Sequence, residues 1–228
     1  MEQKKKAVFL AKRDGFRIRY VFAKGRRERF EALLDFCPDL IDKENLQEHK
    51  DFLRDTRIIV ATWEIPQLTA EEIEQYFPNL ELLIYVAGSV QHFARPYLER
   101  GVRVVSAWGA MSIPVAEFTV GEIIHANKGF YRSLALYKQL SWNDAHWKIL
   151  TEYPGTYHTK VGILGAGMIG SLVIRMLRQY SVQLMVYDPF LTQQRAAALG
   201  IERTYSLDEL FSQCHTISQH TANNPQPV

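Results

Sequence analysis

The run GAGMIG places Gly165, Gly167 and Gly170 between an apolar stretch ending at Leu164 and a helix-like stretch from Met168 to Tyr180. This spacing is typical of a dinucleotide-binding turn. The first glycine allows a sharp bend, the second a close approach of pyrophosphate, and the third close packing of helix on strand. The anion then lies on unpaired amides at the helix N-terminus, where the helix dipole also favours negative charge. We predict that the cofactor contacts are made by Gly165, Gly167, Met168, Ile169 and Gly170.

A second apolar stretch, Gln183 to Tyr187, ends in Asp188, which lies 188 − 170 = 18 residues after the last glycine. A carboxylate at about this distance hydrogen-bonds the ribose hydroxyls and repels the additional phosphate of NADP. Pro189 and Phe190 follow directly and Arg195 comes only later, so the sequence favours NAD. Two alternatives stay open: the glycines form a merely structural turn, or Asp188 and Pro189 only end the strand with turn chemistry.

Composition limits the remaining function classes. The 228 residues, 47% of them hydrophobic, suffice for one large or two small domains, and we favour two. The 27 basic and 25 acidic residues are interspersed, so nucleic-acid binding is not indicated. The short apolar run 7–11 resembles neither a signal peptide nor a membrane span. The two cysteines, Cys37 and Cys214, suggest neither a disulfide nor a metal site and fit a reducing, cytoplasmic setting.

Alternating segments before residue 108 predict a parallel sheet covered by helices. The expected strands are Arg17 to Phe22, Ile58 to Trp63, Leu82 to Val86 and Val102 to Ala107. The expected helices are Arg27 to Phe36, Thr69 to Phe77 and Phe93 to Arg100, with Thr69 as N-cap and Glu72 completing a capping box.

A long helix is expected from about Pro114 to Gln139, with Ser112 as its N-cap. Residues Ser141 to Thr159 are aromatic and rich in turn formers, and they predict a packed link with its aromatics in the core. From Lys160 the pattern predicts strand, glycine turn, helix and strand, followed by a helix over Thr192 to Leu199, a strand near Arg203, a helix over Leu207 to Ser212 and a strand over His215 to Ser218. Asn224 and Pro225 would then begin a further helix, so we expect only the first half of a dinucleotide fold.

Five stretches together resemble the NAD-dependent D-2-hydroxyacid dehydrogenases: YVAGSVQHF from Tyr85, VSAWGAMSIPVAEFTVGEI from Val105, WNDAHW from Trp142, KVGILGAGMIG with VYDP downstream, and LDELFSQCHTISQH from Leu207. The resemblance implies a flavodoxin-like N-terminal substrate domain over residues 1–108. It further implies an incomplete Rossmann-type NAD-binding domain over residues 109–228.

By position in these motifs, Val86, Ala87 and Gly88 match the family loop whose backbone amides hold the substrate carboxylate. An ordinary strand-to-helix turn is the alternative. Pro189 and His220 match residues that border the cofactor. Three departures from the family pattern concern the substrate cleft: Gln219 replaces an apolar residue, and Met111 and Phe118 stand where asparagine and histidine are common.

The resemblance implies an oxidoreductase that interconverts a 2-hydroxy acid and a 2-oxo acid with NAD, and it implies a homodimer. Such chemistry needs a cation for the carboxylate and a base for the hydroxyl proton. In the family the arginine, the acid and the histidine come after the point where this sequence ends, so we assign no catalytic residue and expect an inactive fragment. The alternatives are a non-catalytic NAD-binding module or inactive homologue and, less strongly, an adenosylmethionine-dependent methyltransferase.

Overall fold

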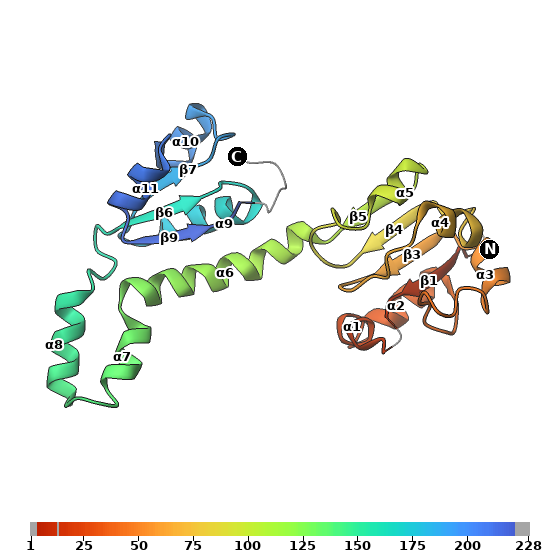
Figure 1. Ribbon diagram of the computed structural model, residues 1–228, viewed down its shortest axis with the longest axis horizontal. Coiled ribbons are helices and arrows are strands. Elements are labelled where there is room, and N and C mark those ends of the chain that lie inside the picture. Colours follow the sequence, from red (N-terminus) through yellow and green to blue (C-terminus); the bar gives the residue numbers. More distant parts are fainter. Residues whose placement is uncertain (1–3, 13, 222–228) are drawn as a thin grey trace. The chain divides into compact units, whose positions relative to one another are not determined.

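The computed structural model describes residues 4–12 and 14–221, and the expected helix start at Asn224 and Pro225 lies outside them. The chain divides into two compact units, Met1–Met111 and Ser112–Val228, whereas the sequence placed the boundary after residue 108. Each unit is an α/β layer structure around its own all-parallel sheet (Figure 1). The predicted α/β class with parallel sheets is thereby confirmed.

The sheet of the first unit has the strand order β2-β1-β3-β4-β5. Its strands are β1 (Lys6–Leu10), β2 (Asp35–Phe36), β3 (Ile58–Ala61), β4 (Leu82–Tyr85) and β5 (Arg103–Ser106). Its helices are α1 (Phe16–Val21), α2 (Arg26–Leu33), α3 (Lys50–Arg54), α4 (Ala70–Tyr76) and α5 (Arg95–Glu99). The sequence prediction missed β1, β2 and α3.

Two apolar layers form on opposite faces of this sheet because successive strand residues point to opposite sides. Val8 and Ile59 share a cluster with side chains of α3, α4 and α5. Phe9 and Val60 share another with side chains of α1 and α2. The capping box of α4 is present, with the Thr69 hydroxyl accepting from the Glu72 amide and the Glu72 carboxylate accepting from the Thr69 amide.

The strand predicted over Arg17 to Phe22 is wrong, because this segment is α1. Ile18 and Phe22 are 2% and 5% exposed, whereas Tyr20 between them is 70% exposed. A strand would turn all three side chains to one face, but a helix brings only the residues four apart together. Burial of that pair against the sheet therefore selects the helix.

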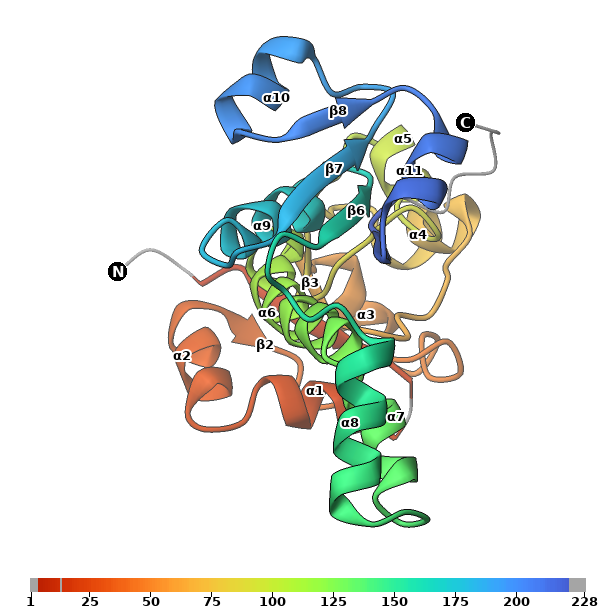
Figure 2. The ribbon, with the colours of Figure 1, turned by 90° about the vertical axis from the view of Figure 1, so that its left-hand side faces the viewer.

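The sheet of the second unit has the order β8-β7-β6-β9, and Figure 2 shows α9 and α11 on its opposite sides. Its strands are β6 (Lys160–Leu164), β7 (Gln183–Tyr187), β8 (Glu202–Thr204) and β9 (Thr216–Gln219). The helices among them are α9 (Met168–Leu177), α10 (Gln193–Leu199) and α11 (Leu207–Gln213). The predicted order of elements after Lys160 is confirmed.

The helical segment before this sheet differs from the prediction. α6 (Trp108–Asn127) begins four residues before Ser112, which lies buried inside it instead of capping it, and it includes Pro114. The helix that was expected to continue to Gln139 ends at Asn127. Gly129, at φ 66°, is the N-cap residue of a separate helix, α7 (Phe130–Leu136). The link expected after Ser141 is largely α8 (Trp142–Glu152).

The aromatic residues of α8 are not core residues. Trp142 and Trp147 are each 66% exposed. Ser141 caps the helix by accepting from the Asp144 amide at 3.2 Å. Among the described residues no helix combines the length and apolar character needed to cross a membrane.

Candidate functional site

The glycine turn and the ends of three strands surround one pocket in the second unit. Its volume is about 290 Å³. The glycine turn connects β6 to α9, the segment after β7 supplies Asp188, and His220 follows β9 directly. In a parallel sheet these carboxyl ends lie at one edge, where α/β proteins bind ligands. The lining residues are Leu164, Gly165, Gly167, Tyr187, Asp188, Pro189, Phe190, Leu207, His220 and Thr221.

The three glycines meet three different environments. Gly165 has φ 93°, and a Cβ on it would lie 3.0 Å from the backbone of His220 and of Thr221. A Cβ on Gly167 would meet nothing within 4 Å, so this position faces open space. A Cβ on Gly170 would lie 2.0 Å from the Gly165 carbonyl oxygen, which is impossible without a shift of the bend.

The bend ends in a helix N-terminus that has no side-chain cap. Gly167 is the N-cap residue of α9 and makes no capping hydrogen bond. The first amides of a helix have no intrahelical acceptor, so Met168 and Ile169 present N–H groups beside the open position at Gly167. Unpaired amides and the helix dipole together suit an anionic diphosphate. These residues fit a dinucleotide.

Asp188 belongs to the bend as well as to the pocket. Its Oδ2 accepts from the Ala166 amide at 2.6 Å, and its Oδ1 accepts from the Phe190 amide at 2.7 Å. The bond from the Phe190 amide forms the turn that the sequence analysis gave as the alternative role of Asp188. Asp188 therefore both forms this turn and lines the pocket. Each of its carboxylate oxygens keeps further lone pairs for a ligand.

His220 lines the pocket directly after the end of β9. Its amide donates to the Leu164 carbonyl at 2.7 Å, and its Nε2 lies 2.9 Å from the Ser218 hydroxyl. Burial lowers the pKa of His220 from its usual value of 6.5, because the charged ring would lose hydration. The histidine is thereby held neutral over a wider pH range.

Sequence reasoning missed the contribution of α10 to this site. The Arg195 guanidinium donates to the Ala166 carbonyl at 3.3 Å and to the Ser171 hydroxyl at 3.1 Å. Arg195 is 29 residues from Ala166, so no local pattern announces the contact.

The predicted substrate loop lies after β4 in the first unit. The Val86 amide is already bonded to the Ala61 carbonyl at 2.7 Å, so it is not free for a ligand. For the amides of Ala87 and Gly88 no hydrogen-bond acceptor is found in the described part of the chain. The loop thus offers two amides where the sequence suggested three.

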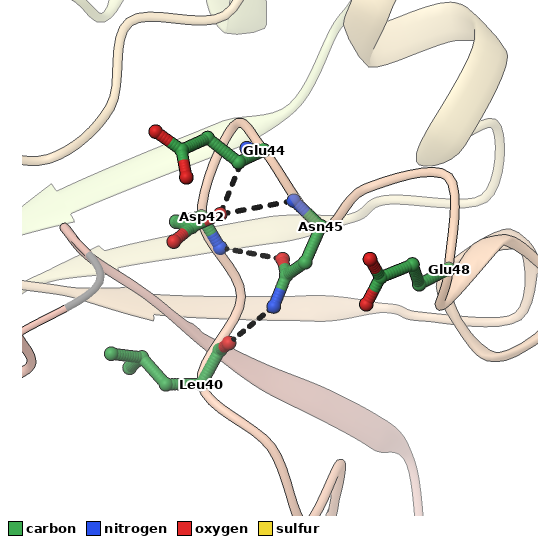
Figure 3. A pocket seen from close by; sticks show the side chains of 5 residues that line it. All are labelled: Leu40, Asp42, Glu44, Asn45 and Glu48. Carbon is green, nitrogen blue, oxygen red and sulfur yellow. Dashed lines mark hydrogen bonds between the residues drawn. The ribbon is translucent and has the colours of Figure 1, made fainter.

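A second, smaller hollow of about 150 Å³ lies in the loop before α3 and is lined by several carboxylates (Figure 3). Asp42 accepts there from the amides of Glu44 and Asn45 at 2.8 and 3.0 Å, and the Asn45 side chain donates to the Leu40 carbonyl at 2.9 Å. These bonds close the loop on itself. No group of three or more His, Cys, Asp or Glu side chains suited to a metal ion exists among the residues that the structure describes.

Comparison with known proteins relates this part of the chain to a protein family. Residues 120–227 match the family model described as D-isomer specific 2-hydroxyacid dehydrogenase, NAD binding domain. D-3-phosphoglycerate dehydrogenase of Methanocaldococcus jannaschii is 29% identical over 128 residues, which are 56% of this chain and 24% of that protein. C-terminal-binding protein 1 of Caenorhabditis elegans is 24% identical over 193 residues, which are 83% of this chain and 26% of that protein.

The fold is found in solved structures as well. D-mandelate dehydrogenase of Rhodotorula graminis superposes with a TM-score of 0.79 at 18% identity, covering 98% of this chain and 67% of that one. The chain spans only about a quarter of the length of the two curated relatives above, 24% and 26% respectively. An adenosylmethionine-dependent methyltransferase has no support in these comparisons. Residues 120–227 belong to the D-isomer specific 2-hydroxyacid dehydrogenase family, as its NAD-binding domain.

Proposed function

We propose that the pocket at the glycine bend binds NAD with its pyrophosphate on the first amides of α9. Gly167 leaves the space for the phosphates, and Gly165 and Gly170 shape the bend. Asp188 faces the ribose hydroxyls, Pro189 borders the same end of the pocket, and His220 forms the wall on the β9 side. The observation that carries this placement is the open position at Gly167 beside unpaired helix amides, within the segment that matches the family.

We further propose that the protein serves an oxidoreductase reaction in which a 2-hydroxy acid and a 2-oxo acid interconvert. When bound, NAD supplies the hydride acceptor. The amides of Ala87 and Gly88 hold the substrate carboxylate, because exposed amides after a parallel strand form an anion site. The Val86 amide instead fixes this loop to β3. The residues 1–111 then serve the substrate and the residues 112–228 serve the cofactor.

The test separates cofactor binding from turnover. Calorimetric titration with NAD should give binding, and titration with adenosylmethionine should give none. NADH formation is then followed by absorbance with a panel of D- and L-2-hydroxy acids. Turnover of D-acids supports the oxidoreductase, whereas NAD binding without turnover of any acid supports the alternative of a non-catalytic NAD-binding module. Absence of NAD binding would refute both.

We also propose that the chain forms a homodimer through α7 and α8. These helices expose large apolar side chains in close succession, among them Tyr131, Leu134, Trp142, Trp147 and Leu150, each between 51% and 66% exposed. Large exposed apolar surface is characteristic of protein interfaces. The free thiols of Cys37 and Cys214 agree with a cytoplasmic location, which we propose on that ground.

A further inference from the structure

A pocket of about 300 Å³ in the first unit is lined by the end of α1, one face of α2 and the residue after β4. The rings of Phe22 and Phe30 meet edge to face at 5.3 Å and form one wall, in which Phe22 is 5% exposed. Leu33 at the end of α2 also lines the pocket and stays 74% exposed. The remaining apolar lining consists of Val21 and Val86. A hydrocarbon group bound here would therefore remove apolar surface from water.

Among the described residues, Arg26 and Arg29 of α2 are the only charged ones that line this pocket. Arg26 donates through Nε to the Val21 carbonyl at 2.6 Å, and its two Nη groups have no acceptor in the described part of the chain. The Arg29 guanidinium has neither a hydrogen-bond acceptor nor a carboxylate within ion-pair distance there. A cation beside an apolar wall attracts an anion more strongly than a cation in open water, because the wall lowers the local dielectric constant.

The segment that forms the pocket carries the positive charge of the whole chain. Residues 12–33 contain eight Lys or Arg and three Asp or Glu, whereas the complete sequence has a net charge of +2, so the rest of it is net negative. Arg17 is paired with Glu64 at 3.2 Å. Arg27 is paired with Glu31 at 2.7 Å. The two arginines of the pocket lack such carboxylates, and their charge is left for an anionic ligand.

We propose that this pocket binds a monocarboxylic acid with a hydrocarbon chain, of the kind of a medium-chain fatty acid. The chain lies against Phe22, Phe30 and Leu33, and the carboxylate is bound by Arg26 and Arg29. A guanidinium suits a carboxylate because it can donate two parallel N–H bonds to it. A neutral hydrocarbon would leave both arginines unused, and an inorganic anion would leave the apolar walls uncovered. The inference does not rest on the proposed dinucleotide pocket, which lies in the second unit.

Calorimetry on the whole chain with butyrate, hexanoate and octanoate tests the proposal. Each two additional methylenes should tighten binding about tenfold, because each is transferred from water to an apolar wall. Arg26→Gln and Arg29→Gln should each weaken octanoate about tenfold and change 1-octanol less than about threefold, since only the acid offers a charge. Leu33→Ser should weaken octanoate and 1-octanol alike, by about threefold or more. Arg19→Gln is the matched control and should leave both affinities unchanged, because this exposed arginine of α1 does not line the pocket.

Four other outcomes would overturn the inference. Octanoate that binds no better than inorganic phosphate would show a surface that attracts any anion. Octanoate affinity that is unaltered in both arginine variants of the pocket would place the acid elsewhere. An equal loss of affinity in Arg19→Gln would show a long-range effect of charge in place of a contact. Octanoate binding that is abolished by saturating NAD would place the acid in the pocket at the glycine bend.

Discussion

Two glycines of one bend should respond to substitution in opposite ways. Gly167→Val places its side chain in open space, where no atom lies within 4 Å of the new Cβ, but the space is that of the proposed pyrophosphate. Gly170→Ala places a methyl group 2.0 Å from the Gly165 carbonyl oxygen. The first change should abolish NAD binding and spare the fold, and the second should damage the fold.

The expected sizes differ enough to be measured. Replacing an N-cap glycine by valine costs about 1 kcal/mol or less. Losing two charge-assisted bonds to the phosphates costs about 3 kcal/mol, or about 100-fold in Kd. For Gly170→Ala the contact must lengthen from 2.0 Å to at least 3.0 Å, which means overpacking at the upper end of its range, about 3 kcal/mol. That lowers Tm by about 10 °C.

Thermal unfolding followed by circular dichroism and calorimetric titration with NAD give the two readouts. Gly121→Ala is the control, since Gly121 lies on α6 with nothing within 4 Å of its added Cβ, and the change should slightly stabilise the helix. Unchanged NAD affinity in Gly167→Val would show that the pyrophosphate does not bind at the bend. A Gly170→Ala protein as stable as the wild type would show that the close contact is not required.

Three further predictions concern other residues of the second unit. Asp188→Ala leaves the Ala166 and Phe190 amides without acceptors, so the free energy of unfolding in urea should fall by about 1–3 kcal/mol. The preference for NAD over NADP should also decrease, and an unaltered preference would mean that the carboxylate does not contact the ribose. The folded-state pKa of His220 is lowered, so the unfolded chain binds more protons. Its contribution to stability is full above pH 6.5 and is lost as pH falls from there through the folded pKa. His220→Gln should remove this part of the pH dependence of unfolding, and identical profiles would contradict it. Trp147→Glu should convert a dimer into a monomer in sedimentation velocity, because it places a charge in the proposed interface; a wild-type monomer would end that proposal.

Errors of the sequence interpretation occur where a local pattern fits two structures. The alternating residues of 17–22 fit a strand, yet packing of Ile18 and Phe22 on one sheet face selects a helix. The tryptophans of α8 were expected in the core from their apolar composition, but both are mostly exposed. Burial depends on which other elements pack against the helix, and composition does not contain that information. The elements from β6 to β7 were predicted well, since an apolar run, a glycine bend and a helix face are encoded by neighbouring residues.

The amino-acid order alone determined the strand–bend–helix unit, the positions of its three glycines, and the acidic residue that follows the next strand, Asp188. It also sufficed to indicate the family and NAD as cofactor, because these signals depend on spacing along the chain. Only the tertiary structure decided that Asp188 holds the bend by the amide of Ala166, that Arg195 holds it by the carbonyl, and that the Val86 amide is occupied. Those contacts join residues 22 to 29 positions apart, and folding brings such groups together through sheet and helix packing that no short segment specifies.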